Sequence, residues 1–437
     1  MEILSSVFSV ATRFLAKIIE QTNKFHIFVF LKDKRNIPSN YSPSTNMKKS
    51  TSLWILFLFV LAGIGMQGCG QAEKPGALLT VDVKADYPEK EMTLQDIMDV
   101  EYIPLETTDE FITQGSVMAV GDKFILVKNY ANDGDIFVFD RKTGKGLRKI
   151  NRKGQGAEEY AYIVSIVLDE ENEEMFVNSS QTILVYDLAG NFKRSFHPAG
   201  GANYMDLFNY DKDNLICYDV TVYYEDGKER EKEFYHAILS KQDGHVVQGL
   251  PIPFKTVSSP FVHQGDGVAA ASVRALVPCR ENWFLVETSS DTVYCYTPEN
   301  KRISPFLVKQ SSGEPEVLVT MGPVTDRYCF LQTIKKEFDF TKGRGFPSTC
   351  LVYDKQENAI FRPVVVNADI TCKQVINLTA NVGNGKVATH QNLMAHQLVE
   401  AYKNNQLKGR LKEIAATLDE DSNPVVMLMK YKNVQPL

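Results

Sequence analysis

The sequence predicts an all-β protein folded as a six-bladed β-propeller, and its internal repetition is the main reason. The stretch "IFVFDRKTGKGLRKI" at 136–150 returns as "ILVYDLAGNFKRSF" at 183–196, each with an apolar run, an Asp, a turn and a basic strand. Runs of this kind close at five residues separated by 47, 53, 57 and 57 positions, namely Phe139, Tyr186, Leu239, Tyr296 and Tyr353. A period of about 50 residues with β-rich units is typical of propeller blades, each a four-stranded antiparallel meander.

The first two repeats divide into four predicted strands each, separated by short turns rich in Gly, Asp and Asn. These strands are expected at 115–120, 123–129, 135–140 and 146–151, and then at 164–169, 174–178, 182–187 and 192–196. Later repeats are less regular. Their predicted strands are 204–210, 214–220 and 235–241 in the third, 272–277, 283–289 and 291–297 in the fourth, and 317–321, 327–334, 349–354 and 359–365 in the fifth.

The sixth repeat lacks an outer strand at the C-terminus. It offers strands at 375–380, 386–391 and 423–432. The stretch "DVEYIPLE" at 99–106 has the character of a strand, so we expect it to complete this blade and close the ring by backbone hydrogen bonds. Residues 99–437 number 339, about 56 for each of six blades, which matches the observed intervals.

One segment inside the last blade has a helical rather than a strand pattern. In residues 392–421 apolar side chains recur at helical spacing, at Met394, Leu398 and Tyr402 and again at Leu407, Leu411, Ile414 and Leu418. The pattern predicts two short helices that meet near Asn404 and Asn405. The insertion either packs on the edge of the ring or serves as a lid or docking surface.

The N-terminal region carries an export signal. Lys48 and Lys49 precede an apolar run at 53–66, and Gly68 stands before Cys69. Fourteen apolar residues are short for a membrane span of about 20, so residues 47–68 are predicted to be a lipoprotein signal peptide, with Cys69 the lipidated residue. Ordinary cleavage and an uncleaved anchor are the alternatives.

The signal peptide defines the remaining boundaries of the chain. Residues 1–46 precede it and are interpreted as a start-site artefact or an extension. Residues 69–98 are predicted to be a tether that ends in a short ordered lead-in, and residues 99–437 form the propeller. The predicted location is the cell envelope, as an outer-membrane lipoprotein attached to the membrane only through its lipid.

Charge and cysteine content narrow the classes of partner. Removing residues 1–68 takes away 8 of the 48 basic and 3 of the 54 acidic residues, which leaves a formal net charge of about −11. Such a chain repels phosphate backbones, so nucleic acid is excluded as an expected partner. The six cysteines after Cys69 show no CxxC pair, and we expect them to be small buried hydrophobic residues.

Four stretches carry a resemblance to a known family: "VEYIPLETTDE" at 100–110, "RKGQGAEEY" at 152–160, "SDTVYCYTPEN" at 290–300 and "NPVVMLMKYK" at 423–432. Together they resemble six-bladed β-propeller lipoproteins related to NHL repeats, which are abundant in the envelopes of some Gram-negative anaerobes. The resemblance covers the chain from about residue 99 to the end. It implies the fold, whereas function must come from the site, because propellers serve as binders, scaffolds and enzymes.

The loop "RKGQGAEEY" is the most distinctive candidate site. Its two glycines permit a tight turn between the first and second blades, and four polar or aromatic side chains surround that turn: Arg152, Gln155, Glu159 and Tyr160. The loop is predicted either to contact a ligand or to form a structural corner in which Arg152 and Glu159 satisfy backbone and neighbouring-blade groups. No phosphate-binding glycine pattern follows it.

Two charged residues fall on predicted inner strands, Asp206 in "YMDLF" and Arg274 in "SVRALV". Either could face the central channel and bind a ligand, or Arg274 could bridge to an adjacent blade. The histidines show no metal-binding spacing, so no metal ligand and no cofactor is assigned. In related propellers that act as lyases or hydrolases a channel metal is held by several blades, and convergence of His197, His263 and His390 is the form this would take here.

Two hypotheses for function remain. The first is a non-catalytic binding or scaffolding protein, predicted to be a monomer, that holds an envelope glycan, peptide or protein on a propeller face. The alternative is a lyase or lactonase of the NHL type with a channel metal. A cluster of three His or carboxylate groups would favour the enzyme, and a shallow apolar or aromatic face would favour the binder.

Overall fold

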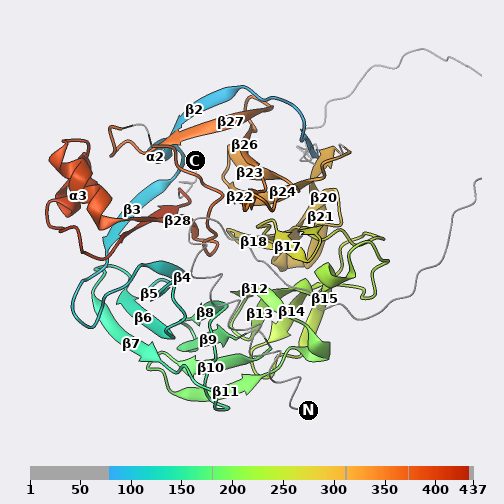
Figure 1. Ribbon diagram of the computed structural model, residues 1–437, viewed down its shortest axis with the longest axis horizontal. Coiled ribbons are helices and arrows are strands. Elements are labelled where there is room, and N and C mark those ends of the chain that lie inside the picture. Colours follow the sequence, from blue (N-terminus) through green and yellow to red (C-terminus); the bar gives the residue numbers. More distant parts are fainter. Residues whose placement is uncertain (1–77, 180, 311–312, 373, 433–437) are drawn as a thin grey trace, which may run out of the picture.

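A computed structural model describes residues 78–179, 181–310, 313–372 and 374–432. Its strands form six blades around a central axis, so the predicted six-bladed β-propeller is confirmed (Figure 1). The predicted signal peptide, Cys69 and residues 1–46 lie outside the described residues. Among the described residues no helix has the length and apolar character needed to cross a membrane.

Blades one to three are four-stranded antiparallel meanders whose strands follow one another from the channel to the perimeter. The eight strands predicted in blades one and two are confirmed to within one residue at each end. Blade one holds β4 (Ser116–Val120), β5 (Phe124–Lys128), β6 (Asp135–Asp140) and β7 (Gly146–Asn151). Blade two holds β8 (Ser165–Asp169), β9 (Glu174–Asn178), β10 (Ile183–Asp187) and β11 (Phe192–Phe196), and blade three β12 (Tyr204–Asn209), β13 (Asn214–Asp219), β14 (His236–Ser240) and β15 (Val246–Leu250).

Blades four and five each have a fifth strand supplied by the N-terminal segment. Blade four holds β18 (Leu276–Cys279), β19 (Asn282–Leu285), β20 (Thr292–Thr297) and β21 (Arg302–Gln310), with β1 (Leu79–Asp82) parallel to β21. Blade five holds β22 (Val317–Val324), β23 (Tyr328–Lys335), β26 (Ser348–Asp354) and β27 (Ala359–Val366), with β2 (Glu89–Thr93) parallel to β27. The five residues that mark the repeat all lie in third strands.

Part of the segment assigned to a tether is therefore built into the ring. Strands begin at Leu79 rather than at Asp99, and a short helix, α2 (Leu94–Ile97), follows β2. The side chains of Val81, Leu94 and Met98 are fully buried in the hydrophobic core. Alternation of polar and apolar residues in "LTVDV" was the available signal for β1, whereas "EKEMT" has a single apolar residue and gave no such signal for β2.

Blade six confirms the predicted closure of the ring. It contains β28 (Val387–Leu393) and β29 (Val425–Lys430), and β3 (Asp99–Pro104) pairs antiparallel with β29 over six residues. The predicted strand at 375–380 is wrong, since only Val375 makes an isolated bridge, to Val366. The carbonyls of Thr379 and Ala380 accept hydrogen bonds from the Arg274 side chain instead of a neighbouring strand.

The two predicted helices are confirmed as α3 (Ala395–Lys403) and α4 (Gly409–Ala415). They lie outside the ring beside blade six (Figure 1). Leu398, Leu411 and Ile414 point into the main hydrophobic cluster, and each is almost fully buried. The insertion thus packs on the edge of the propeller.

The meander topology divides the connections between the two faces of the ring. Links from first to second and from third to fourth strands lie on one face, which we call the turn face, and in the first five blades they contain two to five residues. Links from second to third strands, and crossings to the next blade, lie on the other face, which we call the insertion face. The link between β28 and β29 reaches 31 residues, and other insertion-face links contain η1 (Ala199–Gly201), η2 (Val220–Glu225), β16 (Phe261–Gln264), β17 (Gly267–Ala270), β24 (Phe338–Asp339) and β25 (Arg344–Gly345).

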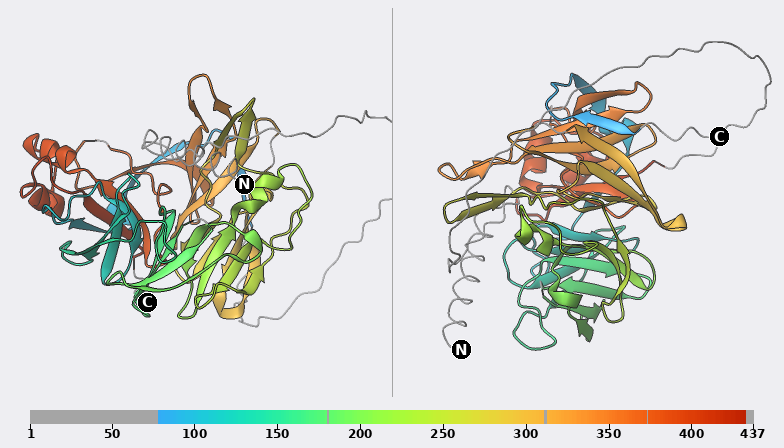
Figure 2. Two further views of the ribbon diagram at one scale, coloured as in Figure 1. Left: turned by 60° about the horizontal axis from the view of Figure 1, so that its bottom comes forward. Right: turned by 90° about the vertical axis from the view of Figure 1, so that its right-hand side faces the viewer.

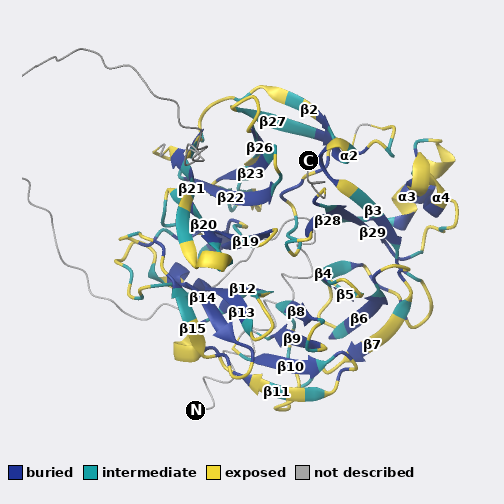
Figure 3. Cartoon of the chain, turned by 180° about the vertical axis from the view of Figure 1, so that it is seen from behind, coloured by how far each residue is buried: buried dark blue, intermediate teal, exposed yellow. Residues whose placement is uncertain are grey.

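The core lies between neighbouring blades. Figure 3 shows the middle strands of the blades buried and the outer strands largely exposed, as the patterns of β9, β10 and β11 illustrate. Phe139, Tyr186, Leu239 and Tyr296 are fully buried. Each packs in a cluster with apolar side chains of the preceding blade, so the repeat reflects one third-strand side chain that fills each boundary between blades.

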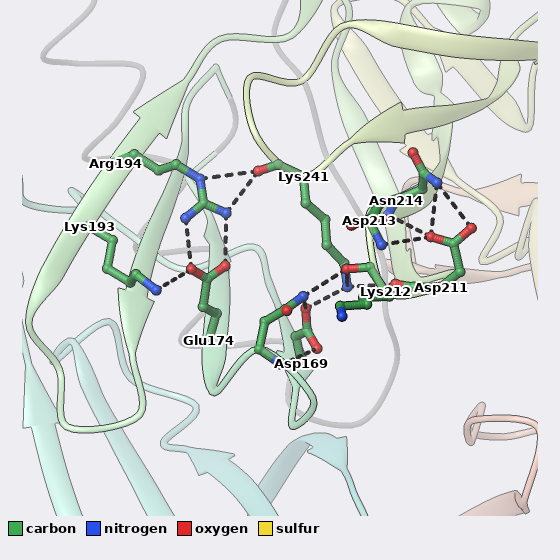
Figure 4. A network of polar contacts seen from close by, with 10 residues as sticks. Asp169, Glu174, Lys193, Arg194, Asp211, Lys212, Asp213, Asn214 and Lys241 are labelled. Atoms are coloured by element: carbon green, nitrogen blue, oxygen red, sulfur yellow. Dashed lines mark hydrogen bonds and ion pairs between the residues drawn. The ribbon is translucent and has the colours of Figure 1, made fainter.

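Buried ion pairs fasten blade two to blade three (Figure 4). The Lys241 ammonium lies against the Asp169 carboxylate, and both side chains are at most 5% exposed. It also donates to the Asp211 carbonyl at 2.6 Å. Arg194 binds both carboxylate oxygens of Glu174 at 2.8 Å and donates to the Lys241 carbonyl, so each charge is paired.

Another buried carboxylate should make stability sensitive to acid. Asp354 contacts Lys90 of β2 and Arg327, each at 2.7 Å. Burial acts to raise the pKa of Asp354, but hydrogen bonds from Arg327 and Lys90 outweigh it and hold that pKa well below its usual value. A depressed folded-state pKa stabilises the fold above the unfolded value of about 3.9, and this contribution disappears as pH falls below that value.

We therefore expect Asp354→Asn to cost about 1.5–3 kcal/mol of unfolding free energy at pH 7, since it weakens hydrogen bonds to charged groups. The variant should then lose less stability than the unmodified protein between pH 5 and pH 2. Urea unfolding followed by circular dichroism at several pH values measures both effects. Asp122→Asn, which removes an exposed carboxylate paired with Lys386, is the control, and equal pH dependence for all three proteins would contradict the prediction.

Candidate binding face

The loop at 152–160 forms a hydrogen-bonded corner on the insertion face. Arg152 donates through Nε to the Gly190 carbonyl at 2.8 Å, and its backbone N–H donates to the Tyr160 hydroxyl at 2.9 Å. Tyr160 is fully buried and donates to the Gly134 carbonyl at 2.7 Å, and burial raises the pKa of Tyr160 to about 12. Glu159 accepts from the Gly156 N–H at 2.8 Å, so these three residues bind their own chain.

Gln155 lies at the exposed tip of the same loop. The structural alternative accounts for the contacts of Arg152, Glu159 and Tyr160, whereas a ligand role for the loop stays a prediction. Since Tyr160 is buried, a ligand would meet the exposed side chains of Arg152, Gln155 and Glu159.

Asp206 and Arg274 come together at the channel, as two candidates from different blades. Asp206 in β12 accepts through Oδ2 from the N–H groups of Ala275 and Leu276, at 2.7 and 3.2 Å. Arg274 precedes β18 rather than lying in it, and its guanidinium donates to the Thr379 and Ala380 carbonyls. Burial raises the pKa of Asp206, while the two N–H groups and the charge of Arg274 oppose that rise.

These contacts belong to a series of side-chain bridges between neighbouring blades. The Asn178 amide donates to the Tyr204 carbonyl in blade three, and the Asn392 amide donates to the Gly115 carbonyl beside blade one. The backbone N–H of Arg274 donates to the Thr320 hydroxyl in blade five at 3.3 Å. The Arg274 side chain instead bridges to the segment that precedes β28 of blade six. Polar groups on or beside inner strands thus join the blades near the channel.

Several side chains near the centre of the ring retain contact with solvent. Asp206, Arg274 and His390 are all partly exposed although they lie near the centre of the ring, and so are the first four residues of β4. Burial lowers the pKa of His390 to about 4, with a smaller contribution from the charge of Arg274, so its imidazole is neutral at pH 7. Its Nδ1 atom has no hydrogen-bond partner among the described residues.

The histidines do not converge on a metal position. His197 lies just beyond the perimeter strand β11, His263 in the hairpin of β16 and His390 in β28. Within the described ranges no three His, Cys, Asp or Glu side chains are grouped in a way that could hold a metal ion.

Two hairpins on the insertion face carry an aromatic cluster that the sequence analysis missed. The hairpins β16–β17 and β24–β25 project side by side from the ring (Figure 2, right), and the Phe340 ring approaches Gly267. Phe261 lies 5.8 Å from Tyr223 and 6.3 Å from Tyr224, measured between ring centroids. Phe338 lies 4.8 Å from Phe340 in the same way.

Exposed aromatic side chains are confined to the insertion face. Among the described residues the exposed tyrosines are Tyr224 at 58%, Tyr130 at 38%, Tyr402 at 37% and Tyr162 at 36%, and each lies in an insertion-face link. The turn-face links of the described chain contain no exposed large hydrophobic residue. The available sequence signal was the presence of aromatic residues in the longer links, where a solvated loop has no packing need for them.

A separate hollow of about 420 Å³ lies at the perimeter, between the N-terminal segment and blades four and five. Leu79, Tyr87 and Tyr353 contribute to its walls. It is remote from the channel, and it arises because β1 and β2 cover only part of the outer strands.

Fold and surface together define a class, the six-bladed propeller with one plain face and one face elaborated by loops, hairpins and exposed tyrosines. Within that class the chain belongs to the DUF5128 family, described as "6-bladed beta-propeller", whose sequence profile matches residues 71–388. No curated protein matches it in sequence.

Two solved structures are similar to this chain at low sequence identity. A putative exported protein from Bacteroides fragilis superimposes with a TM-score of 0.54 at 14% identity, covering 79% of this chain and 99% of its own. A member of the DUF4221 family from Bacteroides vulgatus gives a TM-score of 0.43 at 11% identity, covering 77% and 98%. The first of these likenesses supports the propeller architecture alone, because the identity is too low to transfer a role.

Proposed function

We propose that this protein is a non-catalytic binding or scaffolding protein of the cell envelope, and that its insertion face holds a glycan, peptide or protein partner. The observation that carries the proposal is the segregation of every exposed tyrosine of the described chain onto that one face. Tyrosine combines a large apolar ring with a hydroxyl group, and it is enriched where proteins bind partners.

The proposed location rests on separate observations. The apolar run before Cys69 has the pattern of a lipoprotein signal peptide, and the Bacteroides fragilis propeller with the same fold is described as exported. Lipid attachment at Cys69 on the outer membrane remains the proposed form of anchoring. Mass spectrometry of the mature N-terminus tests it directly, since an unmodified Cys69 would remove the anchor.

The alternative of a lyase or lactonase with a channel metal lacks a ligand set within the described ranges. A face with exposed aromatic side chains favours a binding protein, and the insertion face carries every exposed tyrosine of the described chain.

We expect Tyr224→Ala to weaken partner binding at least tenfold, since a central tyrosine of an interface contributes about 2 kcal/mol or more. Binding is measured by co-sedimentation with isolated cell-wall material and by calorimetry with soluble polysaccharides and peptides. Leu147→Ala is the matched control, because Leu147 is 40% exposed but lies on the outer strand β7. Equal affinities for the two variants would remove the insertion face as the binding surface.

A further inference from the structure

The channel mouth offers two accessible hydrogen-bonding groups of opposite charge. The Oδ2 atom of Asp206 and two nitrogens of Arg274 are occupied by the protein backbone. The Oδ1 atom of Asp206 and the Nε atom of Arg274 have no hydrogen-bond partner among the described residues. Neither atom is among the fully buried side-chain atoms that lack a partner in the described part of the chain. Both atoms therefore retain contact with solvent.

The aromatic cluster begins beside this charged pair. Ala275, whose N–H donates to Asp206, belongs to the same hydrophobic cluster as Tyr223, and Phe261 packs against that cluster. The rings of Tyr223, Phe261 and Tyr224 then continue outward along the insertion face. A ligand that meets Asp206 and Arg274 at the channel thus has aromatic rings within reach.

We propose that the channel mouth is a subsite for a neutral glycan, whose hydroxyl groups donate to Asp206 and accept from Arg274 while an exposed aromatic ring covers an apolar sugar face. This inference rests on the binding function proposed above. It assigns the class of ligand and the two residues that recognise it.

The charge balance decides among ligand classes. A carboxylate or phosphate is attracted by Arg274 but repelled by Asp206. A protonated amine is attracted by Asp206 but repelled by Arg274. A hydroxyl group donates and accepts at once, so neighbouring hydroxyls of one sugar satisfy both groups without leaving either charge unpaired. His390, neutral at pH 7, adds no net charge to this balance.

Calorimetry with a defined panel tests the proposal. The probes are neutral polysaccharides built from glucose, mannose, xylose, galactose and N-acetylglucosamine, with polygalacturonate and a mixed peptide digest as competitors of other classes. We expect a neutral glycan to bind and Asp206→Asn to weaken its binding at least tenfold. Asn keeps an oxygen for the Ala275 and Leu276 N–H groups, so an unchanged melting temperature will show that the fold persists.

Arg274→Met is the second variant, and Arg280→Met is its matched control. Arg280 lies on the turn face, where it pairs with Asp326. We expect weaker binding for Arg274→Met only, judged at a temperature where both variants remain folded. Normal affinity in Asp206→Asn would overturn the subsite while leaving the binding function intact.

The ligand class has its own decisive outcomes. Binding of polygalacturonate or peptides alone would overturn the neutral-glycan assignment and still support a binding protein. Silence across the neutral panel would overturn it as well. Loss of cell-wall binding in Asp206→Asn but not in Leu147→Ala would support the subsite independently of the purified probes.

Discussion

A chain that begins at Asp99 is expected to be largely unfolded under conditions in which a chain that begins at residue 75 is stable. Removing residues 75–98 takes five side chains from the core, each at most 7% exposed: Val81, Met92, Leu94, Ile97 and Met98. Each contributes about 1.5–3 kcal/mol by burial, which together approaches the whole stability of a typical domain, about 5–15 kcal/mol. It also removes β2 from the edge of β27 and Lys90 from Asp354.

Urea unfolding and thermal melting of the two chains measure this effect. A chain that begins at Asp86 is the graded control, because it loses β1 and Val81 but keeps β2, α2 and the contact of Lys90 with Asp354. We expect its loss of stability to be intermediate. Identical melting curves for the chains that begin at residues 75 and 99 would show that the segment is only a tether.

The Lys241→Met variant is expected to lose about 3–5 kcal/mol of unfolding free energy, the typical cost of leaving a buried charge without its partner. Asp169 is 1% exposed at its side chain, so water cannot replace the ammonium group. The Asp211 and Lys212 carbonyls would also lose a donor. Denaturant unfolding at pH 7 measures the loss, which should concentrate at the boundary between blades two and three (Figure 4).

Lys212→Met is the matched control, because it makes the same Lys-to-Met substitution at an exposed position. We expect less than about 0.5 kcal/mol for it. The double variant Asp169→Leu with Lys241→Met should recover part of the loss, since no buried charge remains. A Lys241→Met protein as stable as the control would show that the pair contributes little.

The sequence repeat predicted the propeller because every blade must pack against a neighbouring blade in the same way. A large side chain on the third strand of each blade must fill the space against its neighbour, so Phe139, Tyr186, Leu239 and Tyr296 recur at blade intervals. Closure by β3 was also predictable, since an incomplete sixth repeat and an unassigned N-terminal strand complement each other. The failure at 375–380 has a tertiary cause, because Arg274 reaches the Thr379 and Ala380 carbonyls from another blade.

The candidate site was less accessible from the sequence. Asp206 and Arg274 were selected individually, but 68 positions separate them, and only the ring brings their charges together. Tyr224 and Phe261 were missed, since exposure of an aromatic residue in a loop depends on what neighbouring loops cover. For Tyr160 the error was in the other direction. Its position in a loop suggested a side chain exposed to a ligand, but packing buries it completely.

The sequence by itself determined the number of blades, the strands of the regular repeats, the helical insertion and the strand that closes the ring. These features follow from local periodicity and from a side-chain pattern that each blade repeats. Only the tertiary structure decided that residues 79–97 belong to the ring, that inner strands are joined by polar bridges, and that exposed tyrosines share one face. Those features depend on contacts between residues far apart in the chain, and no local pattern encodes which distant backbone a side chain will meet.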